Sequence, residues 1–355
     1  MKIGITYHNK FQQYDLGPDH PFRGSRFIDS MAFFKKMELL SSPDVTILKP
    51  EKAARQDILL AHVEEYVDYI TTLADQGWSY DIETPVSQKI YEALMLIIGG
   101  AIEAGDAVFE GAVNRAAVLG GGFHHAGEDF GGGFCLFNDV AILARHLQRR
   151  RNVKKVLIID YDVHAGNGTS NIFYSDPSVL FIDLHQDPRT LFPWTGFIEQ
   201  IGANEGLGYN VNIPLPPETS DQNYLYAFEE IVEPLAYEFK PDIILANGGG
   251  DAHFADSLGD LDLTAKGFFK LSKKISEISK KVCGGKMILH IVSGYNPRFL
   301  PLCWYALVSG MTEIESIPVK EPYHPSSEPP MNHKIVVQTL GDLKKNLRDI
   351  WSCFK

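Results

Sequence analysis

The chain has 355 residues, of which 45% are hydrophobic, so it can bury a large core as one big α/β domain or as two smaller ones. Its formal net charge of −12 argues against nucleic acid as a ligand, because phosphate binding requires clustered lysine and arginine. The longest apolar run, around Ala93–Ala104, is interrupted by two glycines and a glutamate and is too short for a membrane span. The four cysteines form no CxxC pair, and Met1–Tyr7 reads as a strand rather than a signal peptide, so we expect a soluble cytoplasmic protein.

Short apolar runs alternate with helical patterns along the chain. Each run is bounded by Gly, Pro or Asp and is too short to be a typical helix, so we interpret the runs as buried strands. Strands that are apolar on both faces and alternate with helices predict a single α/β domain with an open, mainly parallel sheet and helices on both faces. After the first strand, the predicted strands are Ala116–Leu119, Lys155–Ile159, Val179–Ile182, Asp242–Ala246 and Met287–Val292. The predicted helices are Pro85–Glu110, Asp139–Arg149, Asn223–Phe239 and Thr264–Lys281.

The composition changes near the end of the chain. Residues 321–330 are rich in Pro and Ser, which predicts a surface linker after a main domain that spans residues 1–320. Over residues 331–355, apolar residues recur at helical spacing with lysines and arginines between them, which predicts a closing helix packed on the domain. A helix lying on a membrane surface is the alternative. The recurring residues are Leu340, Leu343, Leu347, Ile350 and Trp351.

Ionisable residues follow two of the predicted strands, where parallel α/β sheets bind their ligands. One strand runs directly into Asp160, Asp162 and His164, whose side chains point the same way because extended chain alternates with period two. Another strand is followed, after three glycines, by Asp251. Two carboxylates and one imidazole leave a coordination position open, so Asp162, His164 and Asp251 predict a catalytic metal, Zn²⁺ or alternatively Fe²⁺ or Co²⁺. The plainer alternative for the first cluster is a turn that caps a helix.

Two further strand ends carry groups suited to catalysis. A third strand leads through three glycines to His124 and His125, which can present two imidazoles to one cavity as a proton-transfer pair. They could instead be ligands of a second metal, whereas the lack of a following Gly-Lys-Ser/Thr argues against a phosphate-binding loop. A fourth strand is followed by Gly294 and Tyr295, whose hydroxyl could reach a metal-bound carbonyl. A packing role for this tyrosine is the alternative.

These residues belong to an ordered series of motifs through which the chain resembles the zinc-dependent histone deacetylase superfamily, which includes acetylpolyamine amidohydrolases. The resemblance covers roughly Ile3 to Asn296, and so many matches in order make a chance similarity a poor explanation. The motifs are Gly17-Pro18-Asp19-His20-Pro21-Phe22-Arg23, Glu83-Thr84-Pro85-Val86, Gly122-Phe123-His124-His125-Ala126, Gly133-Phe134-Cys135-Leu136-Phe137-Asn138-Asp139, Asp160 to Gly168, Asp251-Ala252-His253, Leu258-Gly259 and Gly294-Tyr295.

The resemblance implies a role for each catalytic residue. Asp162, His164 and Asp251 would bind zinc. The acid/base pair would be His124, paired with Asp160, and His125, paired with Asn167, with His125 as the general base. Tyr295 would stabilise the oxyanion.

The resemblance also implies the residues around the substrate. Phe134, Phe192 and Leu258, together with Gly133, would line an acyl-lysine tunnel. Glu83 would grip the substrate backbone at its rim, with Asp81 as an alternative, and Arg26 would lie beside the acetate exit path. The implied activity is the hydrolysis of an N-acetyl or other N-acyl amide on a lysine or polyamine-type amine by zinc-activated water. The alternatives are an arginase-like hydrolase with two metals and a catalytically weak binder of acyl-lysine. The sequence leaves the oligomeric state open.

The chain departs from the family pattern at four places. Ala165 stands where a second histidine is usual. Asn167 replaces an aspartate, as in class II members, and would make His125 less basic. Asp183 replaces a serine at a structural K⁺ or Na⁺ site beside Asp160, and Val292-Ser293 replace a Glu-Gly or Gly-Gly pair before Gly294-Tyr295. These departures bear on the rate, the cation site and the substrate, because none of them removes a predicted metal ligand or either histidine.

Overall fold

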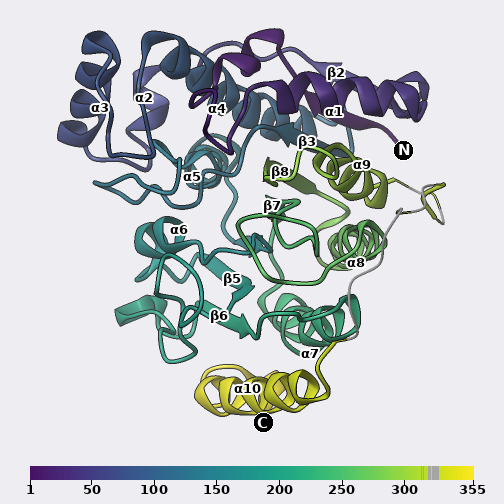
Figure 1. Ribbon diagram of the computed structural model, residues 1–355. Coiled ribbons are helices and arrows are strands. Elements are labelled where there is room, and N and C mark those ends of the chain that lie inside the picture. Colours follow the sequence, from purple (N-terminus) through teal and green to yellow (C-terminus); the bar gives the residue numbers. More distant parts are fainter. Residues whose placement is uncertain (313, 315, 319–320, 322–327) are drawn as a thin grey trace.

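The computed structural model describes residues 1–312, 314, 316–318, 321 and 328–355, and these residues form an α/β structure around an eight-stranded sheet (Figure 1). Each strand is parallel to its neighbours, in the order β2-β1-β3-β8-β7-β4-β5-β6. The predicted open parallel sheet is therefore confirmed. The strands are β1 (Ile3–Thr6), β2 (Val45–Leu48), β3 (Arg115–Leu119), β4 (Val156–Asp160), β5 (Val179–Gln186), β6 (Asn210–Leu215), β7 (Ile243–Gly249) and β8 (Met287–Ser293).

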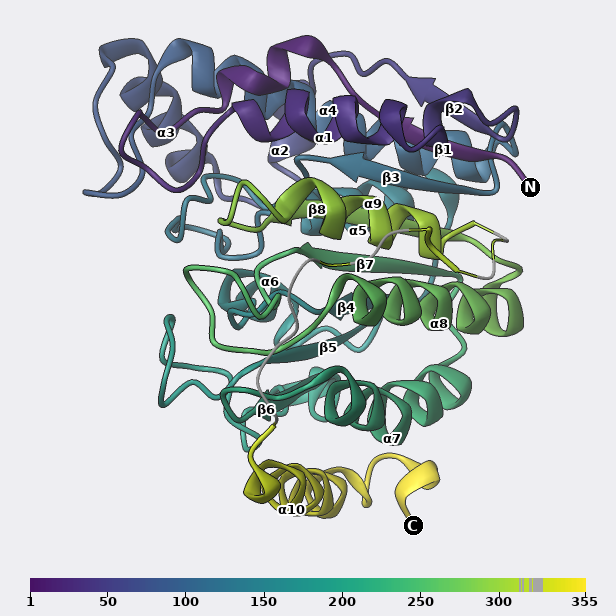
Figure 2. The same ribbon diagram turned by 45° about the vertical axis from the view of Figure 1, so that its right-hand side comes forward.

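Helices cover both faces of the sheet, as the sequence predicted (Figures 1 and 2). Helices α4, α5 and α6 pack on one face, and α1, α9, α8 and α7 pack on the other. Helices α2 and α3 lie against α5 and α4, respectively. The helices are α1 (Ser25–Lys36), α2 (Arg55–Ile58), α3 (Glu64–Gln76), α4 (Gln88–Phe109), α5 (Asp139–Arg151), α6 (Asn167–Phe173), α7 (Asp221–Phe239), α8 (Ala265–Cys283), α9 (Leu300–Gly310) and α10 (Pro330–Leu347).

Side-chain caps fix where the long helices begin. The Ser87 hydroxyl accepts a hydrogen bond from the backbone N–H of Ile90 at the start of α4, and Thr264 does the same for Gly267 at the start of α8. Helix α8 ends at Cys283 and is followed by Gly284, whose φ of +64° is a left-handed conformation that suits glycine. Both helices begin and end within three residues of the predicted bounds.

The two edge strands were not predicted, because neither is a continuous apolar run. Strand β2 has four residues, the middle two of which are exposed. Strand β6 contains Asn210 and Asn212, and it also contains Pro214, which a sheet tolerates at its edge. The central strands β3, β4, β7 and β8 are buried along their whole length, which explains why their apolar runs were recognisable.

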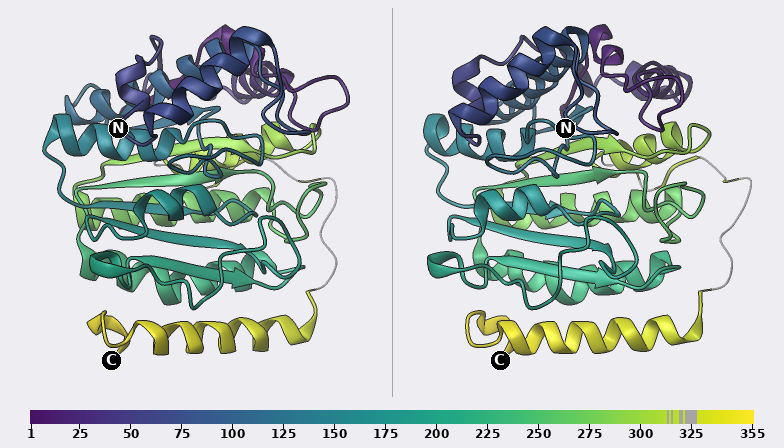
Figure 3. Two further views of the ribbon diagram at one scale, coloured as in Figure 1. Left: turned by 90° about the vertical axis from the view of Figure 1, so that its left-hand side faces the viewer. Right: turned by 60° about the vertical axis from the view of Figure 1, so that its left-hand side comes forward.

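The last helix, α10, packs beside the β6 edge of the sheet and against α7 (Figure 3). Its buried residues include Leu340, Leu343 and Leu347, and the Trp351 indole N–H donates to the Gly208 carbonyl at 2.8 Å. The division into a catalytic domain, a linker and a closing helix stays a prediction, and residues 322–327 of the predicted linker lie outside the described residues. In the part of the chain that the structure describes, no helix is long and apolar enough to span a bilayer.

Candidate active site

Four adjacent strands at the centre of the sheet bring the predicted residues together. Strands β3, β8, β7 and β4 are neighbours and run in parallel, so their carboxyl ends meet at one edge. The histidine pair follows β3, Tyr295 follows β8, Asp251 follows β7, and Asp162 and His164 follow β4. A cavity at this edge is lined by His124, His125, Asp162, His164, Tyr295 and Phe134, among others.

Asp162, His164 and Asp251 form a compact buried group. The His164 Nδ1 atom lies 3.1 Å from Asp162 Oδ1 and 3.3 Å from Asp251 Oδ2. One ligand atom from each residue lies within 4.8 Å of the other two, the spacing of a shared metal ligand set, and the described residues contain no other such group. Asp251 Oδ2 is buried and makes no hydrogen bond. Two carboxylates and an imidazole with such an orphaned oxygen fit a divalent cation with nitrogen and oxygen ligands.

The electrostatics of this group favour positive charge between its members. Burial raises the pKa of Asp251, and the neighbouring Asp162 carboxylate raises it further. Burial alone would lower the pKa of His164, but its contacts with Asp162 and Asp251 raise it to about 10. Two buried carboxylates that face each other are therefore compensated by a proton on the imidazole, and a bound cation would meet the same need.

The two adjacent histidines lie in a chain of hydrogen bonds. His124 Nδ1 lies 2.9 Å from Asp160 Oδ2, and the Nε2 atoms of His124 and His125 are 3.2 Å apart. His125 Nδ1 lies 2.7 Å from the Asn167 carboxamide oxygen. Because that oxygen can only accept, His125 carries a proton on Nδ1 and leaves Nε2 free to accept one.

The pKa values of the two histidines are pushed apart. Burial lowers the pKa of His125 well below its usual value, and the charges of His124 and His164 lower it further. Burial would also lower the pKa of His124, but the carboxylates of Asp160 and Asp162 raise it to about 9. At neutral pH His124 is therefore the charged member of the pair and His125 is a neutral base.

Aromatic side chains surround the candidate site at this edge of the sheet. The Phe134 ring lies 5.8 Å from the Tyr295 ring, and the Phe192 ring lies 5.1 Å from that of His125. Gly133 has a φ of +51°, and a Cβ there would clash with the His125 ring. Tyr295 lines the cavity, and its hydroxyl has no hydrogen-bond partner among the described residues.

The remaining predicted residues lie further from the metal group. Leu258 is half-buried and Glu83 is exposed, and the Glu83 charge acts on His20, whose ring lies 4.5 Å from that of Phe134. The Arg26 guanidinium donates to the Val292 carbonyl at 2.7 Å, and burial lowers its pKa to about 10. Arg26 and Tyr295 both line a second cavity of about 310 Å³. The structure thus places Arg26 next to the candidate catalytic edge.

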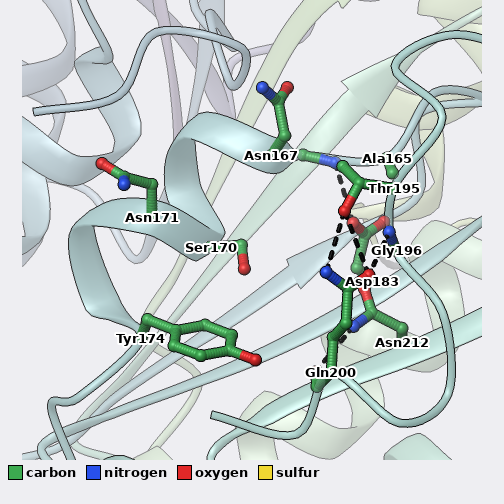
Figure 4. Close-up of a pocket in the computed structure, with 11 residues that line it drawn as sticks. Ala165, Asn167, Ser170, Asn171, Tyr174, Asp183, Thr195, Gly196, Gln200 and Asn212 are labelled. Atoms are coloured by element: carbon green, nitrogen blue, oxygen red, sulfur yellow. Dashed lines mark hydrogen bonds between the residues drawn. The ribbon is translucent and has the colours of Figure 1, made fainter. Parts of the chain in front are cut away.

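Three of the four departures from the family pattern line one polar cavity of about 250 Å³ (Figure 4). These are Ala165, Asn167 and Asp183. Asp183 Oδ2 accepts a hydrogen bond from the Gly166 N–H at 2.8 Å, and its Oδ1 lies 2.9 Å from His185 Nδ1. Asp183 Oδ1 and His185 Nδ1 are nevertheless buried without a hydrogen bond, and a K⁺ or Na⁺ ion near Asp160 and Asp183 stays a prediction.

Two carboxylates that support the site were not singled out from the sequence. Asp139 accepts hydrogen bonds from the backbone N–H groups of Gly122 and Phe123 and so holds the loop that carries the histidine pair. Asp256 accepts a hydrogen bond from the Tyr295 N–H at 2.6 Å. Asp139 ends a motif of the family resemblance and begins a predicted helix, but we assigned it no role in the site, and Asp256 follows a strand end, which is the signal that could have drawn attention to it.

Comparison with known proteins gives a consistent result. The model of the histone deacetylase domain family matches residues 20–311. A protein named "Probable deacetylase" from Archaeoglobus fulgidus is 34% identical over 364 residues, which cover 100% of both chains. The "Acetoin utilization protein AcuC" of Bacillus subtilis (strain 168) is 33% identical over 321 residues, or 88% of this chain and 82% of the relative. The crystal structure of the HDA15 HD domain superposes with a TM-score of 0.87 at 28% identity, covering 100% of this chain and 98% of that one.

Proposed function

Because the chain belongs to the family of histone deacetylase domains, we propose that it is a Zn²⁺-dependent deacylase that hydrolyses an N-acetyl or other N-acyl amide on a lysine or polyamine-type amine. The observation that carries this proposal is the position of the Asp162–His164–Asp251 group beside a histidine pair with unequal pKa values. Hydrolysis of an unactivated amide needs an activated water, a base and a stabilised oxyanion, and candidates for all three converge at this edge.

Asp162, His164 and Asp251 would hold the metal. When bound there, Zn²⁺ supplies Lewis acidity, which lowers the pKa of water and polarises a carbonyl group. Because His125 lines the cavity and its Nε2 atom is unprotonated, this atom would accept a proton from the attacking water and return one to the leaving amine. His124, held by Asp160, keeps a positive charge next to this base.

Tyr295 would stabilise the oxyanion. Its hydroxyl has no partner among the described residues, and its ring lies against Phe134 in the cavity wall. A hydroxyl placed there can donate to the carbonyl oxygen as negative charge develops, and one such donor is typically worth about 3–4 kcal/mol.

Phe134 and Phe192 support an elongated substrate with an apolar stem. Their rings flank Tyr295 and His125, respectively, and such walls suit the methylene chain of a lysine or polyamine. The net charge of −12 favours a cationic substrate in general. We therefore propose acetyl-lysine in a protein or peptide, or an acetylpolyamine, as the substrate.

The same geometry argues against the two alternatives. A binuclear hydrolase would need ligands for a second metal, but the ring nitrogens of His124 and His125 face Asp160, Asn167 and each other. A catalytically weak binder would lack a catalytic group, whereas each of the positions that the mechanism uses is filled.

A turnover screen of the zinc-loaded protein tests the proposal. Acetyl-lysine peptides, acetylpolyamines and longer acyl-lysines would be compared for amine release, with metal content measured on the same sample. One metal per chain together with turnover of any of these amides would support the proposal. Two metals per chain would favour the binuclear alternative, and tight binding of acyl-lysine without turnover would favour the binder.

A further inference from the structure

One carboxylate links two of the loops that carry the candidate site, those that follow β7 and β8. Asp256 lies five residues after Asp251, in the loop that follows β7. Its Oδ2 atom accepts hydrogen bonds from the backbone N–H groups of Tyr295, at 2.6 Å, and Asn296, at 3.2 Å, in the loop that follows β8. Its Oδ1 atom accepts a third from the N–H of Leu258, at 3.0 Å. The Asp256 side chain thus joins the Asp251 loop to the Tyr295 loop through three backbone N–H groups.

The Tyr295 loop depends on these bonds for its position. Gly294 has a φ of +117°, so the chain turns sharply just before the tyrosine. The Ser293 carbonyl accepts from the Trp304 indole N–H at 2.9 Å, which fixes the loop up to that turn. Beyond it, the Tyr295 N–H is bonded to Asp256, and the Asn296 side chain donates to the Ala255 carbonyl at 2.6 Å. Past the turn, the backbone is therefore held by the Asp256 loop and, through the Asn296 carbonyl, which accepts from the Leu300 N–H at 2.9 Å, by the start of α9.

We propose that Asp256 is a positioning residue that holds the Tyr295 hydroxyl in register with the Asp162–His164–Asp251 group. This inference rests on the proposed function, because it assigns Asp256 an effect that acts through the oxyanion role of Tyr295. Asp251 and Asp256 lie five residues apart in the loop that follows β7, so the link ties the tyrosine to the segment that carries one of the proposed metal ligands.

The chemistry of the three donors requires a carboxylate. Three N–H groups converge on two oxygens, and an ionised carboxylate offers an acceptor on each. In Asp256→Asn, one of the two oxygens becomes an NH₂ group, which would face an N–H donor. The substitution keeps the size of the side chain but releases either the Tyr295 side or the Leu258 side of the link.

A double-mutant cycle tests this role. The kcat and KM of Asp256→Asn, Tyr295→Phe and the double variant would be measured on an acetyl-lysine peptide with zinc-loaded protein, together with metal content and thermal unfolding. We expect Asp256→Asn to lower kcat roughly 10- to 100-fold, as misplacement of a catalytic group by about 1 Å does, with little change in KM or metal content. The double variant should be no slower than Tyr295→Phe, because displacing a tyrosine that lacks its hydroxyl costs nothing further.

Asp242→Asn is the matched control. Asp242 also accepts hydrogen bonds from two successive backbone N–H groups, those of Lys154 and Lys155, but it does so at the amino ends of β4 and β7, at the opposite edge of the sheet. This control should leave kcat unchanged. If Asp256→Asn does not fold, Asp256→Glu keeps the charge and displaces it by one methylene, and the same cycle applies.

The outcomes separate the inference from the proposed function. If Asp256→Asn slows the Tyr295→Phe protein by the same factor as the wild type, Asp256 does not act through Tyr295 and the inference is wrong, while the proposed function stands. If Tyr295→Phe alone leaves kcat unchanged, the proposed oxyanion role itself is wrong, and the positioning role falls with it.

Discussion

The stability of the protein should fall as the pH is lowered because of one buried histidine, His62. Its side chain is 4% exposed, and its Nε2 atom accepts a hydrogen bond from the Asn138 N–H at 2.9 Å. The Asn138 carboxamide in turn donates to the Ala126 carbonyl, which directly follows the candidate catalytic histidines in the chain, and to the Thr169 hydroxyl. Burial lowers the pKa of His62 from 6.5 to about 4, because a charged imidazole would be poorly solvated there. Protonation would also remove the acceptor that Asn138 needs.

The sign and size of the effect follow from this difference in pKa. Between about pH 6.5 and pH 4 the unfolded chain binds a proton at His62 and the folded protein does not, so folding stability is full above pH 6.5 and is lost as the pH falls through that range. A pKa that is lower by about 2.5 in the folded protein corresponds to a contribution of roughly 3 kcal/mol to the free energy of unfolding. Roughly 2.5 kcal/mol of this contribution is lost by about pH 4.5.

The contribution of His62 to the free energy of unfolding can be measured by urea unfolding of the wild type and of His62→Gln, at about pH 7.5 and about pH 4.5. The carboxamide oxygen of the substituted glutamine can accept the Asn138 N–H but does not titrate, so the contributions of all other groups cancel in the difference between the two proteins. The free energy of unfolding of the wild type should fall by roughly 2.5 kcal/mol more than that of the variant. An equal pH dependence in both proteins would refute the reasoning.

Three further predictions concern the catalytic edge. Asp251→Ala should lower the metal content sharply and leave the far-UV circular dichroism spectrum unchanged, and full activity in metal-free protein would contradict the proposed metal role. His125→Ala should retain zinc but lose activity by about 10²–10⁴-fold in a turnover assay, whereas loss of zinc would make His125 a ligand and favour the binuclear alternative. Tyr295→Phe should lower kcat by roughly 10²-fold at unchanged zinc affinity, and an unchanged kcat would make Tyr295 a packing residue.

The centre of the fold could be predicted from the sequence because burial on both faces leaves a continuous apolar run. This rule found β4 and β7, whose ends then located Asp162, His164 and Asp251. It failed at the sheet edges, and it also missed α9, in which all eleven residues are buried. A helix that is apolar all round shows no 3.6-residue period, so the pattern that reveals surface helices was absent.

The candidate site was predictable where it depends on residues close in sequence to a strand end, and was not where it depends on distant pairs. The alternation of Asp160, Asp162 and His164 is a local property of extended chain. By contrast, the bonds from His62 to Asn138 and from Asp256 to Tyr295 join residues 76 and 39 positions apart. Nothing in the composition of either segment indicates its partner, because such pairing is set by how the loops pack.

The neutral partner of His125 explains how two adjacent imidazoles come to differ. Had a carboxylate stood at Asn167, it would have favoured the charged form of His125 as Asp160 favours that of His124, and two neighbouring imidazoles would then compete for positive charge. With a carboxamide in that place, burial and the charges of His124 and His164 lower the pKa of His125 and outweigh the Asn167 hydrogen bond and the Asp162 charge, which raise it. The difference between Asp160 and Asn167 therefore favours a positive charge on His124 and a neutral His125, which is the division that the proposed general base requires.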